Sequence, residues 1–140
     1  MRKVNVIGVG MTKFTTPKAL IPYTTMGTEA ARDAIKDAGI EYKDIEQAYT
    51  GWVYADSCAG EKVLYDIGMT GIPIFNVNNN CSTGSNALYL ARMAVASGAI
   101  ECALALGFEQ MTPGALGAMF MDRPMPMETF FIAPPNPDRT

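Results

Sequence analysis

The chain has 140 residues, of which 49% are hydrophobic and 18% charged, and its net charge is −3. This length and composition are typical of one globular domain or a large part of one. The slightly acidic balance and the lack of a basic cluster argue against a surface for nucleic acid or for an anionic membrane.

The cysteine and histidine content limits the chemistry that the chain can perform. The sequence has three cysteines, Cys58, Cys81 and Cys102, and no histidine. Because no two cysteines form a CxxC pair, we expect no metal site, zinc included. The absence of histidine also excludes Ser-His-Asp and Cys-His catalysis built from this chain alone.

Two observations favour a cytoplasmic protein. An odd number of cysteines, with no recognisable export signal, suits a reducing compartment. The apolar run in the opening MRKVNVIGVGM is too short and too interrupted for a signal peptide. No stretch of the sequence reaches the ~20 apolar residues of a membrane-spanning helix, so we expect no membrane partner.

The first half of the chain predicts two strands and two helices. The apolar run at residues 3–9 predicts a short buried strand. Alanines recur at helical spacing over residues 25–38, and Gly39 is well placed to end that helix. Residues 48–53 are strand-like, and residues 61–68 predict a short helix that ends at a glycine.

The second half continues the same alternation. The segment IPIFNV at residues 72–77 predicts a buried strand, and Thr83–Ser97 predicts a helix followed by Gly98. The segment CALALGF at residues 102–108 predicts another apolar strand. Strands that alternate with helices predict an α/β fold with a mainly parallel sheet flanked by helices.

The composition changes after about residue 111. The remaining residues are rich in proline and methionine and show little periodicity, which predicts a loop-rich segment with at most one short helix. The chain ends in a proline-rich run without a closing strand or helix. We therefore expect an incomplete domain, the front part of a longer protein.

Cys81 follows a predicted strand and precedes the predicted helix Thr83–Ser97, in the segment NVNNNCSTGSNAL. Unpaired N–H groups and the helix dipole favour negative charge at such a position, and the thiolate is the attacking form in covalent catalysis. The same N–H groups are suited to stabilise an oxyanion on a bound acyl group. Free cysteine is also commonly a small buried hydrophobic residue, so both roles stay open for Cys81.

The other candidate residues carry weaker signals. Cys102 lies in an apolar strand, where core packing is expected, and Cys58 lies in a turn-like stretch as a bystander thiol. Glu109 follows an apolar strand, from which it can reach an active site or cap backbone groups. The asparagines at residues 78–80 suit either contacts to a substrate or stabilisation of a turn.

The predicted helix after Cys81 is apolar almost all round, whereas a surface helix shows a clear polar face. We therefore expect this helix to be buried in a large core or at a subunit interface. Arg92 is its one long charged residue and requires a partner or a path to solvent.

The segment NVNNNCSTGSNALYLARMAVASGAIECALALGFEQM resembles the region around the nucleophilic cysteine of thiolases, and the nearest likeness is to the sterol carrier protein X-type subgroup. The opening VNVIGVGMTKF also resembles the start of that subgroup. The resemblance implies a thiolase-like α/β fold, of which the chain holds the first, N-terminal half in incomplete form. Residues 1–110 would be a partial N-terminal domain, and residues 111–140 the start of the loop domain.

Thiolases exchange acyl groups between coenzyme A thioesters, either cleaving a 3-oxoacyl-CoA or condensing two acyl-CoAs. By this resemblance Cys81 is the nucleophile that becomes acylated, and Asn80, Ser82, Met111 and Met119 bind substrate. The acyl-CoA is the substrate, and no separate cofactor is expected. The helix after Cys81 and the strand before it are expected near the interface of a homodimer or tetramer.

The chain departs from a complete thiolase in its length. In the family a second, similar half supplies a catalytic histidine and a second cysteine, so we expect incomplete turnover from these 140 residues. Two alternatives stay open within the same fold. One is a non-catalytic thiolase-like subunit that binds lipid or a partner protein. The other is a thiolase-like aldolase that cleaves steroid side chains together with an accessory protein subunit.

Overall fold

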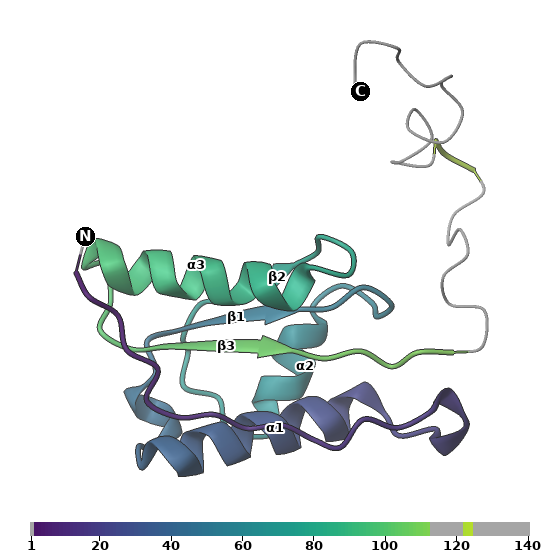
Figure 1. Ribbon diagram of the computed structural model, residues 1–140, viewed down its shortest axis with the longest axis horizontal. Coiled ribbons are helices and arrows are strands. Elements are labelled where there is room, and N and C mark those ends of the chain that lie inside the picture. Colours follow the sequence, from purple (N-terminus) through teal and green to yellow (C-terminus); the bar gives the residue numbers. More distant parts are fainter. Residues whose placement is uncertain (1, 113–121, 125–140) are drawn as a thin grey trace, which may run out of the picture.

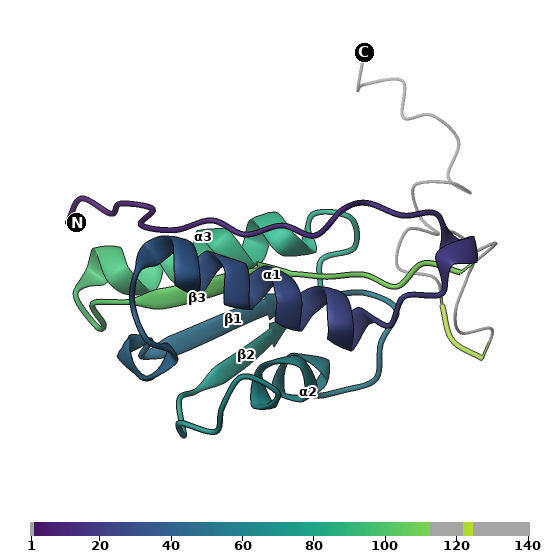
Figure 2. The same cartoon turned by 90° about the horizontal axis from the view of Figure 1, so that it is seen from below.

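The computed structural model describes residues 2–112 and 122–124. The predicted architecture, a parallel sheet flanked by helices, is confirmed in this part of the chain (Figures 1 and 2). The elements in chain order are η1 (Pro17–Ala19), α1 (Tyr23–Ala38), η2 (Tyr42–Asp44), β1 (Gln47–Gly51), α2 (Ala59–Tyr65), β2 (Ile74–Val77), α3 (Thr83–Ser97) and β3 (Ala103–Gly107).

The described sheet has three strands in the order β2-β1-β3, and both pairings are parallel. Thr50 of β1 lies opposite Asn76 of β2 and Leu106 of β3. The connections between the strands run through α2 and α3. All three strands therefore end at the same edge of the sheet, which is also the edge at which α3 begins (Figure 1).

The two faces of the sheet carry side chains of different size. The face covered by α1 and α2 holds the larger apolar residues, among them Val63, Leu64, Leu104, Leu106 and Phe108. The face covered by α3 is lined by Tyr49 and by the alanines Ala87, Ala91, Ala103 and Ala105. The alternation along each strand sends successive residues to opposite faces. The small residues on one face allow α3 to lie close against the sheet.

Helix limits agree well with the sequence patterns. The predicted helix Thr83–Ser97 is found with the same bounds, and α1 begins two residues earlier than predicted. Gly39 ends α1 in the left-handed region, at φ 67°, and its N–H donates to the carbonyl of Lys36. A glycine is favoured there because a Cβ atom penalises this backbone conformation.

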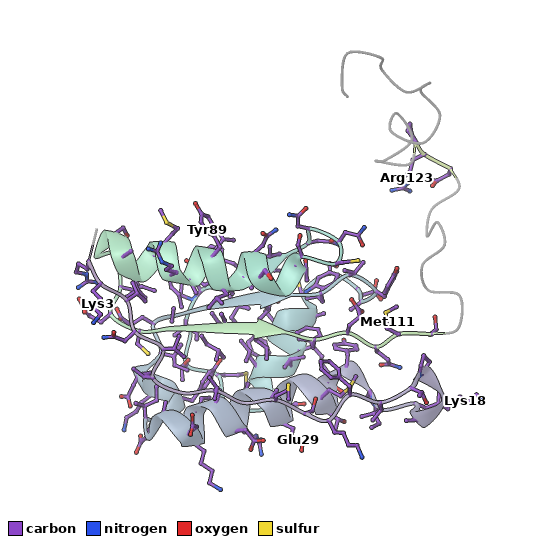
Figure 3. The ribbon with its side chains drawn as sticks, in the orientation of Figure 1. Lys3, Lys18, Glu29, Tyr89, Met111 and Arg123 are labelled. Atoms are coloured by element: carbon purple, nitrogen blue, oxygen red, sulfur yellow. The ribbon has the colours of Figure 1, made fainter. Side chains whose placement is uncertain are left out.

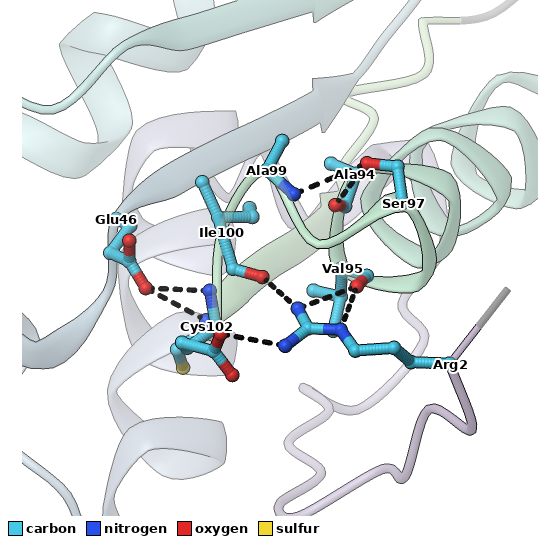
Figure 4. Close-up of polar contacts among 9 residues, drawn as sticks. Arg2, Glu46, Ala94, Val95, Ser97, Ala99, Ile100 and Cys102 are labelled. Carbon is cyan, nitrogen blue, oxygen red and sulfur yellow. Dashed lines mark hydrogen bonds and ion pairs between the residues drawn. The ribbon is translucent and has the colours of Figure 1, made fainter.

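The prediction of a buried strand at residues 3–9 is wrong. The segment forms no strand and is mostly exposed, with 74% exposure at Val6. The guanidinium of Arg2 donates to the carbonyls of Val95 in α3 and of Ile100 just after it (Figure 4). The N–H of Val9 donates to Asp37 of α1. An apolar run predicts a strand, but it cannot show whether a neighbouring strand is present to pair with it.

Of the two places expected for the apolar helix α3, a large core within this chain is not what the described structure shows, and a subunit interface stays a prediction. Ala87 and Ala91 are buried against the sheet, whereas Leu88 and Tyr89 on the outer side are 56% and 59% exposed. Tyr89 points away from the sheet (Figure 3). One sheet can cover only one side of a helix, so the apolar outer side has no cover in the described structure. No helix in the described part of the chain is long and apolar enough to cross a membrane.

Asn76 connects β1, β2 and α2 through its side-chain amide. The amide oxygen accepts hydrogen bonds from the N–H of Gly60 at 2.9 Å, the indole N–H of Trp52 at 2.8 Å and the hydroxyl of Thr50 at 3.2 Å. The amide nitrogen donates to Glu61 at 2.7 Å. A side chain at Gly60 would overlap the hydroxyl of Thr50, so α2 can start this close to the sheet only with glycine at that position.

We predict that Gly60→Ala destabilises the protein by about 1–3 kcal/mol, as overpacking of a tight core typically does. Urea unfolding followed by circular dichroism measures this change. The matched control is Gly84→Ala in α3, where an added Cβ meets its nearest atom at 3.8 Å, an ordinary contact. We expect no loss of stability in this control, because alanine stabilises a helix by up to ~1 kcal/mol over glycine. Equal midpoints for the two variants would contradict the tight packing at Gly60.

Candidate active site

Cys81 lies in the connection between β2 and α3, at the edge where the strands end (Figure 1). The N-cap of α3 is Ser82, so Cys81 directly precedes the helix, as the sequence predicts. Its thiol is exposed, and its sulfur lies 3.7 Å from the side-chain oxygen of Asn80. Asn80 has a left-handed backbone, with φ 50°, which asparagine tolerates better than most residues. The turn at Asn80 presents the thiol to solvent.

The asparagines before Cys81 hold the turn together. The N–H of Asn80 donates to the side chain of Asn78, and both the N–H and the hydroxyl of Ser82 donate to the carbonyl of Asn79. The N–H of Thr83 donates to the carbonyl of Asn80 at 3.0 Å. Turn stabilisation, one of the two roles left open for the asparagines, is therefore observed.

These bonds also affect the expected anion site at the start of α3. The N–H groups of Ser82 and Thr83 already pair with carbonyls of the preceding turn. They are therefore not free to bind an oxyanion while the turn has this conformation. N–H groups farther into the first turn would have to provide that stabilisation.

Two residues that sequence reasoning did not single out support the Cys81 connection. Asn76 joins the strands next to it, and the hydroxyl of Thr83 donates to the carbonyl of Val77, the last residue of β2. A hydroxyl residue at the start of a predicted helix is a known signal for local backbone bonding. The sequence alone does not show which carbonyl such a hydroxyl reaches.

Glu109 caps backbone N–H groups that follow β1. The structure shows the capping role for Glu109: its carboxylate accepts hydrogen bonds from the N–H groups of Val53 at 2.8 Å and Tyr54 at 3.1 Å. The bonds hold the segment after β1 against the segment after β3. Both segments lie at the same edge of the sheet as Cys81, so Glu109 stabilises the surroundings of the candidate site.

The other two cysteines differ in their surroundings. Cys58 is exposed and precedes α2 in a left-handed conformation, with φ 65°. Cys102 directly precedes β3, is half-buried and packs against the larger core, as the sequence predicts for a core residue. Burial raises the pKa of the Cys102 thiol, and the carboxylates of Glu46 and Asp44 raise it further. Glu46 also accepts a hydrogen bond from the N–H of Cys102 (Figure 4).

The predicted substrate-binding residues fall into separate places. Asn80 and Ser82 flank Cys81 in the turn, whereas Met111 lies beyond the end of β3 (Figure 3). Met111 lines a cavity of about 390 Å³ together with residues of the N-terminal segment, such as Phe14 and Leu20, and no residue from 76 to 85 lines it. Met119 lies outside the described residues. No cluster of three or more potential metal ligands occurs in the described part of the chain.

We predict that the three cysteines differ in their rates of alkylation by iodoacetamide at pH 7.5. Cys58 and Cys81 are exposed and are expected to react first, whereas Cys102 is half-buried and has a raised thiol pKa, so less of it is thiolate. The rate at Cys102 should rise as the pH is increased, since the thiolate fraction grows. Peptide mapping by mass spectrometry at successive times measures the order. Alkylation of Cys102 as fast as Cys58 would contradict its half-buried position.

Comparison with known proteins places the chain in a family. Residues 4–123 match the family described as "Thiolase, N-terminal domain". Human "Sterol carrier protein 2" is 50% identical over 131 residues, which cover 91% of this chain and 24% of that protein. The "Benzoylsuccinyl-CoA thiolase subunit BbsB" of Thauera aromatica is 37% identical over 113 residues, which cover 79% of this chain and 29% of that protein.

A solved structure shows the same fold. The acetyl-CoA acetyltransferase from Syntrophomonas wolfei superposes with a TM-score of 0.64 at 20% identity, over 70% of this chain and 26% of that one. The chain spans about a quarter of the length of these sterol carrier protein relatives. The family match over most of the chain, together with the parallel sheet and the cysteine before α3, shows that this chain belongs to the thiolase family and that residues 4–123 correspond to its N-terminal domain.

Proposed function

We propose that this chain is the N-terminal, cysteine-bearing part of an acyl-CoA thiolase and that Cys81 is its nucleophile. The observation that supports this proposal best is the position of the Cys81 thiol. It is exposed at the start of α3, at the edge where all three described strands end, in a chain of the thiolase family. In open α/β sheets this edge is the usual place for ligands.

In the first half-reaction the Cys81 thiolate attacks the carbonyl carbon of an acyl-CoA. A new C–S bond forms, and the electron pair of the carbonyl moves to oxygen. When the carbonyl reforms, the bond to the sulfur of coenzyme A breaks. The acyl group stays on Cys81 as a thioester, coenzyme A leaves as a thiolate that takes up a proton, and the proton lost by Cys81 passes to a base or to water.

The second half-reaction needs groups that this chain does not contain. Transfer of the acyl group to a carbon nucleophile requires removal of a proton from that carbon, and the reverse cleavage requires its return. General acid–base groups for such steps typically contribute about 10²–10⁴-fold each. The chain has no histidine. We propose that the rest of a full-length thiolase supplies these groups and that the 140 residues perform at most the acylation step.

The remaining assignments belong to the same proposal. Asn80 and Ser82 contact the acyl thioester next to Cys81, while Met111 and Met119 contact the acyl chain or coenzyme A. The only small molecule required is the acyl-CoA substrate, without a further cofactor, and the protein works in the cytoplasm.

We further propose that the chain associates with a second copy through β2 and the outer side of α3. β2 is an edge strand in the described sheet, and its Phe75 is 44% exposed. Leu88 and Tyr89 add apolar surface on α3. Exposed apolar patches of this kind commonly mark protein interfaces.

The acylation step predicts a covalent adduct on one cysteine. The protein is incubated with radiolabelled acetyl-CoA and with a longer acyl-CoA, and the adduct is located by peptide mass spectrometry. We expect label on Cys81 and its loss in Cys81→Ser, while Cys58→Ser retains it. Label that persists in Cys81→Ser would remove Cys81 from the proposed role and would favour a non-catalytic lipid- or partner-binding subunit.

The proposed interface predicts a dimer in solution. We expect Tyr89→Glu to shift the mass measured by light scattering toward that of a monomer, because a charge cannot be buried there without a partner. Phe14→Glu is the matched control, since Phe14 is 90% exposed in the segment before α1, outside β2 and α3. A wild-type monomer that binds no hydrophobic dye would contradict the proposed interface.

A further inference from the structure

The hydroxyl of Thr83 closes the backbone loop that carries Cys81. It donates to the carbonyl of Val77 at 3.0 Å and accepts a hydrogen bond from the N–H of Asn79 at 2.7 Å. Val77 is the last residue of β2, and Thr83 is the first residue of α3. One hydroxyl therefore joins the end of the strand, the middle of the loop and the start of the helix.

Thr83 has little freedom to move. Its side chain is buried, with a residue exposure of 7%, and an added Cβ at Gly51 would lie 2.6 Å from its carbonyl oxygen. The carbonyl of Val77 also accepts the N–H of Trp52, at 3.3 Å. The hydroxyl is thus held between the end of β1 and the end of β2, both of which belong to the sheet.

Cys81 itself has no such anchor. It is exposed, and within the described residues its side chain makes a weak contact to Asn80 at 3.7 Å, so the direction of the thiol depends on the backbone of the loop. Asn80 holds a left-handed conformation with φ 50°, which persists only where the surrounding structure stabilises it. The hydrogen bonds of the Thr83 hydroxyl add to those of Asn78 and Ser82 within the turn, and they alone connect the turn to the end of β2 through a side chain among the bonds described.

We infer that Thr83 is a positioning residue for Cys81: its buried hydroxyl fixes the loop from Val77 to Thr83 so that the thiol sits at the start of α3. The inference rests on the proposed acylation of Cys81. Thr83 does not need to contact substrate. Its loss should therefore lower the rate of the chemical step and leave substrate binding nearly unchanged. Misplacement of a reacting group by about 1 Å can cost about 10²-fold in rate.

The test compares Thr83→Val, which removes the hydroxyl and keeps the shape, with Thr83→Ser, which keeps the hydroxyl. Thr28→Val is the matched control, because the partly buried hydroxyl of Thr28 also donates to a backbone carbonyl, that of Val63 at 2.9 Å, between α1 and α2 and outside the Cys81 loop. Single-turnover acylation by labelled acyl-CoA is measured over a range of acyl-CoA concentrations. Urea unfolding shows whether each variant is folded.

We expect Thr83→Val to lower the maximal acylation rate about 10–100-fold, with a half-saturating concentration within about twofold of wild type. Thr83→Ser and Thr28→Val should stay within about threefold of the wild-type rate. A wild-type rate in Thr83→Val, an equal loss in Thr83→Ser, or an equal loss in Thr28→Val would each overturn the inference.

Hydrogen–deuterium exchange provides a measurement that does not depend on acylation. Removal of the hydroxyl takes away the acceptor of the Asn79 N–H, so peptides covering residues 76–85 should exchange at least about tenfold faster in Thr83→Val alone. Unchanged exchange there would overturn the inference.

The two proposals fail in different ways. If wild-type protein is not acylated, or if Cys81→Ser is still labelled, the proposed function fails. The positioning role is then tested by the rate of Cys81 alkylation by iodoacetamide, which should fall at least about threefold in Thr83→Val and not in Thr83→Ser. An unchanged alkylation rate would overturn the role of Thr83.

Discussion

The close approach of α3 to the sheet is the constraint on which the rest of the candidate site depends. A Cβ at Gly51 would lie 2.6 Å from the carbonyl oxygen of Thr83, and one at Gly107 would lie 3.3 Å from the Cα of Gly84. Ala87 and Ala91 continue the contact along the helix. Because the first turn of α3 lies directly on the ends of β1 and β3, the chain between β2 and α3 has to turn sharply at the sheet edge, and Cys81 lies in that turn.

The two faces of the sheet differ in the size of the side chains that cover them. Larger side chains fill the layer between the sheet and the pair α1 and α2, where burial of apolar surface contributes most to folding. The α3 layer has small side chains and, at the end that carries Cys81, a network of backbone and hydroxyl hydrogen bonds. The outer side of α3, with Leu88 and Tyr89, is apolar and exposed in the described structure, which agrees with an assembly that covers it.

Local patterns were sufficient for most elements and for the position of Cys81. Helical spacing and the following Gly98 predicted the limits of α3, and the apolar runs predicted all three strands within one to two residues. Cys81 before the helix could be inferred because strand, turn and helix signals are contiguous in the sequence. The N-terminal segment shows the limit of this reasoning, since a strand also needs a neighbour to pair with.

Sequence alone determined the alternation of strands and helices, the family, and the place of a lone cysteine at the start of a helix, because these depend on residues close together in the chain. Only the tertiary structure decided what the side chains far apart in sequence do. In it the Glu109 carboxylate accepts hydrogen bonds from the N–H groups of Val53 and Tyr54. The Asn76 amide oxygen accepts hydrogen bonds from the N–H of Gly60 and the indole N–H of Trp52. The tertiary structure also left one side of α3 exposed. Such contacts, and such exposed surfaces, follow from how the elements pack against one another. The periodicity of a single segment carries no information about its packing partners.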